Sequence, residues 1–142
     1  MLQYMLDTDT VIYTIKNRPP DVRATFRSHA GQLAVSSITL MELIYGAEIS
    51  SSTETNLRAV ESFSARLDVL PFDQAAATHA GQVRAELRRL GSPIGAYDEM
   101  IAGHARSLGL VVVTNNLRHF RKVPGIRVVN WIKGQRKTGA DL

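Results

Sequence analysis

Three acidic residues and one asparagine, far apart along the chain, carry oxygen atoms suited to holding a metal ion: Asp7, Glu42, Asp98 and Asn116. Carboxylate and amide oxygens are hard ligands, and such a set favours Mg²⁺ or Mn²⁺ over zinc. The sequence has no cysteine, and its four histidines share no metal-binding spacing. A thiolate zinc site and a cysteine nucleophile are therefore excluded. The chemistry predicted from these residues is the binding of Mg²⁺ or Mn²⁺.

The first two acidic residues lie next to predicted strands. The apolar residues 2–6 predict a short buried strand that ends at Asp7. Residues 32–36 predict a second strand, and Glu42 lies near the start of the helix predicted over 37–49.

The other two residues flank a further strand. Asp98 is predicted to begin a helix that Gly109 ends, and the apolar strand over 110–113 leads into Asn116. In open parallel sheets, ligand sites form beyond the carboxyl ends of the strands, so all four side chains are expected at one edge. The remaining predicted elements are a helix capped by Thr8, a helix from Pro20 to about His29, a helix over 56–66, strands at 69–70 and 128–129, and a long helix from Asp73 to Gly91. Strands alternating with helices predict a single α/β domain with a central parallel sheet flanked by helices.

Each of these residues also has a structural interpretation. Asp7 could be a solvated strand end, and Asp98 a helix N-cap. Glu42 completes a capping-box pattern that begins at Thr39. Asn116 could simply form a turn. The metal-binding hypothesis therefore rests on the joint placement of the four residues rather than on any one of them.

A phosphatase of the haloacid-dehalogenase type is a rival interpretation. Residues 6–11 (LDTDTV) match its D-x-D-x-[TV] signature, in which Asp7 would be the nucleophile. That reaction also needs a late acidic metal motif, and residues 100–140 contain no acid. Motifs for a serine nucleophile, a dinucleotide or ATP are also missing from the sequence.

Length and composition predict one globular domain. A chain of 142 residues and 15.6 kDa is served by a single core. No apolar run approaches the ~20 residues that a membrane span needs, so we expect a cytoplasmic protein without membrane association.

The charge distribution favours a polyanionic partner such as nucleic acid. The net charge is +4, and residues 100–140 hold eight Lys or Arg and no acid. Such a segment suits a polyanion, because phosphate contacts release condensed counterions. Arg118, Arg121 and Lys122 directly follow Asn116 and are the expected phosphate contacts. Residues 133–142 are expected to form a flexible basic extension outside the domain of residues 1–132.

Four segments together resemble the PIN-domain ribonucleases, and more closely the VapC toxins of type II toxin–antitoxin systems. They are residues 4–8 (YMLDT), 36–48 (SSITLMELIYGAE), 91–105 (GSPIGAYDEMIAGHA) and 113–116 (VTNN). The resemblance runs from residue 1 to about 132 and is closest to the enterobacterial VapC branch. It implies the PIN fold and a metal-dependent endoribonuclease.

The resemblance assigns the metal-binding acids to Asp7 and Asp98, with Glu42 as the third. The family commonly has a further acid after the fourth strand, where this chain has Asn116 and His119. Mg²⁺ or Mn²⁺ would relieve the repulsion among the carboxylates, polarise the scissile phosphate and activate a water. The implied substrate is a structured RNA, with the anticodon stem-loop of initiator tRNA as the leading hypothesis. Cleavage would leave a 3′-hydroxyl and a 5′-phosphate and would inhibit translation.

The resemblance also implies partners. These are a second copy of the chain, a VapB-like antitoxin that blocks the site, and operator DNA reached only through the antitoxin. The apolar contact residues are expected among Val11, Ile12 and Ile15 and on the helix with Leu43, Ile44 and Ala47. The alternative function from another class is a non-catalytic corepressor that only supports a DNA-binding antitoxin.

Overall fold

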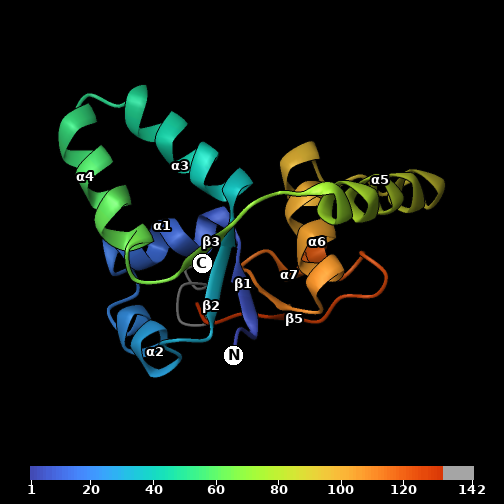
Figure 1. The fold of residues 1–142 in the computed structure, drawn as a ribbon, viewed down its shortest axis with the longest axis horizontal. Coiled ribbons are helices and arrows are strands. Elements are labelled where there is room, and N and C mark those ends of the chain that lie inside the picture. Colours follow the sequence, from blue (N-terminus) through green and yellow to red (C-terminus); the bar gives the residue numbers. More distant parts are fainter. Residues whose placement is uncertain (133–142) are drawn as a thin grey trace.

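Five parallel strands form one sheet in the order β3-β2-β1-β4-β5 (Figure 1). The computed structural model describes residues 1–132, so the prediction for 133–142 lies outside the described residues. The strands are β1 (Tyr4–Leu6), β2 (Leu33–Ser36), β3 (Asp68–Leu70), β4 (Val111–Val113) and β5 (Val128–Val129). The chain builds outward from β1 on one side and then returns to pair β4 on its other side. This reversal makes the β1–β4 junction the switch point where such sheets open a crevice.

Helices cover both faces of the sheet. They are α1 (Thr8–Lys16), α2 (Val22–Ser28), α3 (Ser37–Glu48), α4 (Thr53–Ser64), α5 (Gln74–Arg89), α6 (Ala96–Leu108) and α7 (Leu117–Phe120). Figure 1 shows α1, α3 and α4 on one side of the sheet, and α5, α6 and α7 on the other. The predicted α/β class with a flanked parallel sheet is confirmed.

Alternation along the strands creates two cores. Met5 packs with the residues of α5 and α6, while its neighbour Leu6 packs with those of α1, α3 and α4. Val112 and Val113 divide in the same way between the two clusters. Because successive side chains of a strand point to opposite faces, a short apolar strand serves both cores.

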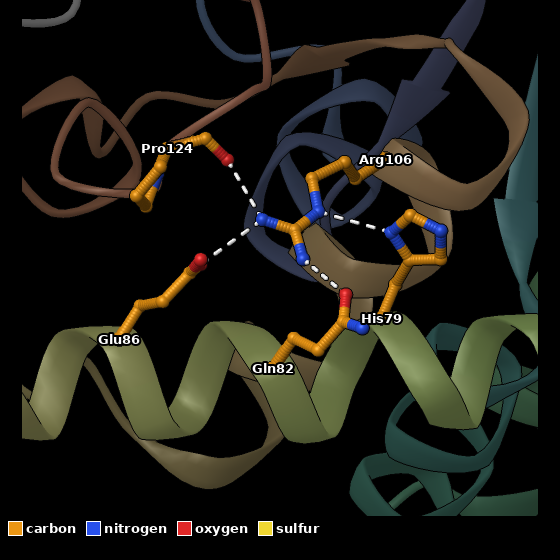
Figure 2. A network of polar contacts seen from close by, with 5 residues as sticks. All are labelled: His79, Gln82, Glu86, Arg106 and Pro124. Carbon is orange, nitrogen blue, oxygen red and sulfur yellow. Dashed lines mark hydrogen bonds and ion pairs between the residues drawn. The ribbon is translucent and has the colours of Figure 1, made fainter.

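The helices α5 and α6 are in direct backbone contact. A Cβ added to Gly103 would lie 2.4 Å from the Cα of Ala80, so only glycine fits at this crossing. Farther along, the Arg106 guanidinium donates to His79 Nδ1 (3.0 Å) and to side-chain oxygens of Gln82 and Glu86 (Figure 2). It also donates to the carbonyl of Pro124, which joins the chain before β5 to both helices.

A buried hydroxyl joins α3 to α6. Ser36 is the N-cap of α3, and its Oγ accepts from the amide of Ile38 at 3.0 Å. The same oxygen lies 2.9 Å from Nδ1 of His104, whose side chain is buried in α6. Burial lowers the pKa of the His104 imidazole, which keeps the ring neutral in this contact.

Three sequence-based predictions about helix starts were wrong. Asp7, not Thr8, caps α1, because its Oδ1 accepts from the amide of Thr10 at 2.9 Å. Asp98 lies inside the first turn of α6, whose N-cap is Gly95. The capping box at Glu42 does not form, because Ser36 caps α3 and places Glu42 beyond the first turn.

Other boundaries shift by a few residues. The second helix begins at Val22 rather than Pro20, and α4 begins at Thr53 rather than residue 56. The short helix α7 was not predicted. Within residues 1–132, none of the helices is long and apolar enough to cross a membrane.

Candidate metal-binding site

Asp7 lies at the switch point of the sheet and is held by two hydrogen bonds. It directly follows β1 and is 4% exposed. Its Oδ1 caps α1 through Thr10, and its Oδ2 accepts from the hydroxyl of Thr114 at 2.6 Å, just after β4. The aspartate is therefore fixed between the ends of the two central strands.

The environment of Asp7 disfavours a free carboxylate. Burial raises the pKa of Asp7 to about 6, and the hydrogen bonds from Thr114 and Thr10 oppose that rise. The negative charge of Asp9 adds to it. A cation bound next to this buried carboxylate would favour its ionised form.

Asp98 faces the same group of acids from the first turn of α6. Burial, together with the charges of Asp7 and Glu42, raises the pKa of Asp98 to about 7. Asp9 and Glu99 contribute in the same direction. Asp7 after β1 and Glu42 on α3 are thus close enough for their charges to act on Asp98 of α6.

Glu42 is partly buried and turns toward α1. Its Oε1 accepts from the hydroxyl of Thr8 at 2.5 Å, and the same hydroxyl lies 3.3 Å from Oγ1 of Thr39. This contact replaces the capping box as the local role of Glu42.

Asp9 was missed as a member of this site. It is exposed in the first turn of α1, and its charge raises the pKa of both Asp7 and Asp98. The available signal was its position two residues after Asp7, a spacing that also belongs to the phosphatase signature.

Asn116 is paired with the histidine of α7. Its side-chain nitrogen lies 2.9 Å from Nδ1 of His119, and its backbone amide donates to the Thr114 hydroxyl that holds Asp7. Asn116 therefore reaches the site through Thr114. Arg118, Arg121 and Lys122 follow it and are all exposed.

The donor set fits a divalent cation. Both ion pairs of the described residues, Arg84–Glu99 and Arg106–Glu86, leave Asp7, Glu42 and Asp98 without a basic partner. Within residues 1–132, no three acidic or histidine side chains are already arranged as a metal cage. An ion shared by all three carboxylates would have to draw their side chains closer together.

Comparison with known proteins gives consistent matches. The sequence profile of the PIN domain matches residues 4–126. The chain is 60% identical to the tRNA(fMet)-specific endonuclease VapC of Salmonella typhimurium, over 92% of this chain and 99% of that one. Identity to the protein of the same name from Shigella flexneri is 57%, over the same shares of the two chains.

Solved structures agree. The toxin–antitoxin complex VapBC of Salmonella typhimurium, bound to DNA, contains a chain that superposes with a TM-score of 0.89 at 60% identity. The match covers 92% of this chain and 99% of that one. VapBC2 of Rickettsia felis, bound to a promoter fragment, gives a TM-score of 0.86 at 33% identity, again over 92% and 99% of the two chains.

Proposed function

The chain belongs to the PIN-domain family, in its VapC branch of enterobacterial type, and on this basis we propose that it is a Mg²⁺- or Mn²⁺-dependent endoribonuclease that inhibits translation. The observation that carries the proposal is the group of unpaired carboxylates at the switch point of the sheet. Burial raises the pKa of both Asp7 and Asp98, and the charges of Asp7 and Glu42 add to the rise at Asp98. A divalent cation compensates the charges of both aspartates.

Each residue has a distinct task in the proposed reaction. Asp7, fixed by Thr114 and Thr10, would be the principal metal ligand, with Asp98 opposite it and Glu42 as the third. When bound, Mg²⁺ or Mn²⁺ would polarise the scissile phosphate and activate a water for in-line attack. Asp98, with a pKa of about 7, would release its proton on ion binding. Asn116 supports Asp7 through Thr114 and brings no charge of its own.

We propose initiator tRNA, cut in its anticodon stem-loop, as the substrate. The support is the high identity to two relatives that are named tRNA(fMet)-specific endonucleases. The exposed Arg118, Arg121 and Lys122 follow β4 and would hold backbone phosphates, which position an RNA without reading its sequence. The proposed products carry a 3′-hydroxyl and a 5′-phosphate.

A groove between α1, α3 and α4 supports a VapB-like antitoxin as the protein partner. It encloses about 250 Å³, and its lining includes Ile12, Ile15 and Val60 with Glu42 at the same surface. The exposed Ile44 lies on α3 beside it. Of the other residues expected in this contact, Leu43 and Ala47 also line the groove, whereas Val11 is a core residue at 0% exposed.

An antitoxin would block the site from this groove. An Arg or Lys of the antitoxin could pair with the carboxylates in place of the metal. The solved relatives are complexes bound to DNA, which supports operator DNA as a partner reached through the antitoxin. A homodimer is part of the same proposal.

The two alternatives are less well supported. A purely non-catalytic corepressor has no need for Asp7, Glu42 and Asp98 together with the threonine that positions Asp7. The phosphatase alternative needs a late acidic motif, whereas the PIN profile accounts for residues 4–126.

The decisive experiment is cleavage of transcribed initiator tRNA by the purified protein, with Mg²⁺ or with EDTA. Asp7→Asn should abolish cleavage while the circular dichroism spectrum is unchanged. Asp68→Asn is the matched control, because Asp68 is exposed at the start of β3, away from the carboxyl edge. Full activity of a folded Asp7→Asn protein would refute the proposal.

A further inference from the structure

A second pocket lies beside the proposed metal site, between α5 and the start of α6. It encloses about 350 Å³ and is lined by Arg84, Arg88, Pro93, Gly95, Ala96 and Glu99. Two of these residues flank Asp98 in the sequence, so the pocket opens within one helical turn of a proposed metal ligand.

One wall of the pocket is basic. Arg84 and Arg88 are four residues apart on α5, which places both side chains on the same face of that helix. Both are exposed. The opposite wall is the N-terminus of α6, whose N-cap Gly95 offers no side chain to its first amides. Guanidinium groups and helix amides together favour a phosphate group.

The floor of the pocket holds an acidic side chain with little compensation. Glu99 is 5% exposed, and the only basic group near it within residues 1–132 is Arg84, at 3.9 Å. That separation is too long for a hydrogen bond. No hydrogen-bond donor of the described residues reaches the Glu99 carboxylate. Among the described residues, Asn17 Oδ1 is the one buried polar side-chain atom without a partner, so the Glu99 oxygens remain open to the pocket, where a ligand can donate hydrogen bonds to them.

The basic wall and Glu99 are therefore complementary to different groups of one ligand. The arginines favour an anion, and Glu99 favours a hydroxyl or amino group that donates a hydrogen bond. A ribonucleotide carries both, because its phosphate is anionic and its 2′-hydroxyl and base edges donate. An acidic peptide would satisfy the arginines and leave its carboxylates facing Glu99.

We propose that the pocket of Arg84, Arg88 and Glu99 binds one ribonucleotide of the RNA substrate, next to the nucleotide that is cut. The phosphate lies between the two arginines and the first turn of α6. Glu99 accepts a hydrogen bond from the ribose or the base. This inference rests on the proposed ribonuclease function and adds a second contact point on the α5 side of Asp98.

The arginines are tested by RNA binding in an Asp7→Asn background, which prevents cutting and leaves the pocket intact. The probe is transcribed initiator tRNA, and its Kd is measured over a range of salt concentrations. Replacing Arg84 and Arg88 by Ala should weaken binding at least tenfold. The slope of log affinity against log salt should flatten by about 1.4, at roughly 0.7 per lost phosphate contact. Arg89→Ala is the matched control, because Arg89 is exposed on the same helix outside the pocket.

Glu99 is tested by its preference for RNA over DNA. Loss of its negative charge by Glu99→Leu strengthens binding of either nucleic acid, so the ratio of the two Kd values isolates the hydrogen bond. The ratio of the Kd for a 2′-deoxy copy of the anticodon stem-loop to that for the RNA should fall several-fold in Glu99→Leu. Glu99→Gln, which keeps an acceptor oxygen, should retain most of the preference for RNA over the 2′-deoxy copy.

Two outcomes would overturn the inference. One is an unchanged salt slope and Kd in the double arginine variant. The other is unchanged RNA affinity combined with loss of the dimer in light scattering, which would make the pocket a protein interface. Cleavage by the otherwise unmodified chain separates the two proposals. Cleavage of the tRNA by the double arginine variant with an unaltered KM would refute only this inference. Absence of both tRNA cleavage and tRNA binding in the otherwise unmodified chain would refute the proposed function as well.

Discussion

The hydroxyl of Thr114 lies 2.6 Å from Oδ2 of Asp7, and this bond ties the ends of β1 and β4 together at the proposed metal site. Thr114 is fully buried, and its oxygen also accepts from the amide of Asn116. A single threonine thus sets the position of Asp7 and the path of the chain into α7.

Thr114→Val should raise the pH that the enzyme needs. The hydrogen bond from Thr114 lowers the pKa of Asp7, so its removal raises that pKa above about 6. Protons then compete with Mg²⁺ up to a higher pH, and the acid limb of the cleavage profile moves to higher pH. The unsatisfied carboxylate should also cost about 1–3 kcal/mol of stability. The measurement is the half-saturating Mg²⁺ concentration from pH 5.5 to 8.5. Thr78→Val, on the exposed face of α5, should leave that profile unchanged.

The metal-free protein should lose stability as pH rises from 5 to 8. The folded pKa values of Asp7 and Asp98, about 6 and about 7, lie above the ordinary value of 3.8. In this window the unfolded chain has already released protons that the folded chain still holds, so rising pH favours unfolding. For Asp7 the shift amounts to roughly 1.4 kcal/mol between pH 5 and 8.

Urea unfolding in EDTA measures this loss. Asp7→Asn should reduce the fall by about that amount, and Asp68→Asn should not. Saturating Mg²⁺ should stabilise the unmodified chain more at pH 8 than at pH 5.5, because the ion binds the deprotonated carboxylates. An equal effect of Mg²⁺ at the two pH values would contradict the assignment of the ligands.

The basic residues after β4 should control the salt dependence of RNA binding. In an inactive Asp98→Asn background, replacing Arg118 and Arg121 by Ala should reduce the salt slope by roughly one to two units. Arg58→Ala, exposed on α4, provides a control for a general loss of charge. If the slope stays the same, the RNA lies on another face of the molecule.

Gly103→Ala should destabilise the fold, because its new Cβ would meet the backbone of Ala80 at 2.4 Å. The helices α5 and α6 would have to separate, and overpacking of this kind costs about 1–3 kcal/mol. Gly81→Ala is the matched control, since Gly81 lies in α5 with nothing within 4 Å of an added Cβ. That change should stabilise the protein by roughly 0.5–1 kcal/mol through helix propensity. Thermal melts of the two variants should therefore shift in opposite directions.

The sequence was informative where short-range patterns decide structure. The apolar run before Asp7 and the alternation of strands with helices were enough to predict the parallel sheet. The helix starts were less accessible. Asp98 is a good N-cap by residue type, but Gly95 takes that position at φ 107°, a conformation that glycine adopts readily.

Individual long-range hydrogen bonds could not be predicted. Glu42 bonds to Thr8, 34 residues away, and the pattern around Glu42 instead suggested a local capping box. The four residues of α7 are too few to produce a helical period. The effect of Asp9 on the pKa of Asp98 could not be predicted, because it depends on the distance between α1 and α6 in space.

The hydrogen bond between the Ser36 hydroxyl and the His104 ring restricts which segments of this fold can be exchanged with those of a relative. Ser36 caps the helix that carries Glu42, and His104 belongs to the helix that carries Asp98. A chimera that takes residues 96–108 from a relative must keep a hydroxyl at position 36, or the imported imidazole is buried without a partner. Loop grafts and helix exchanges in this protein should therefore treat β2 and α6 as one inherited unit.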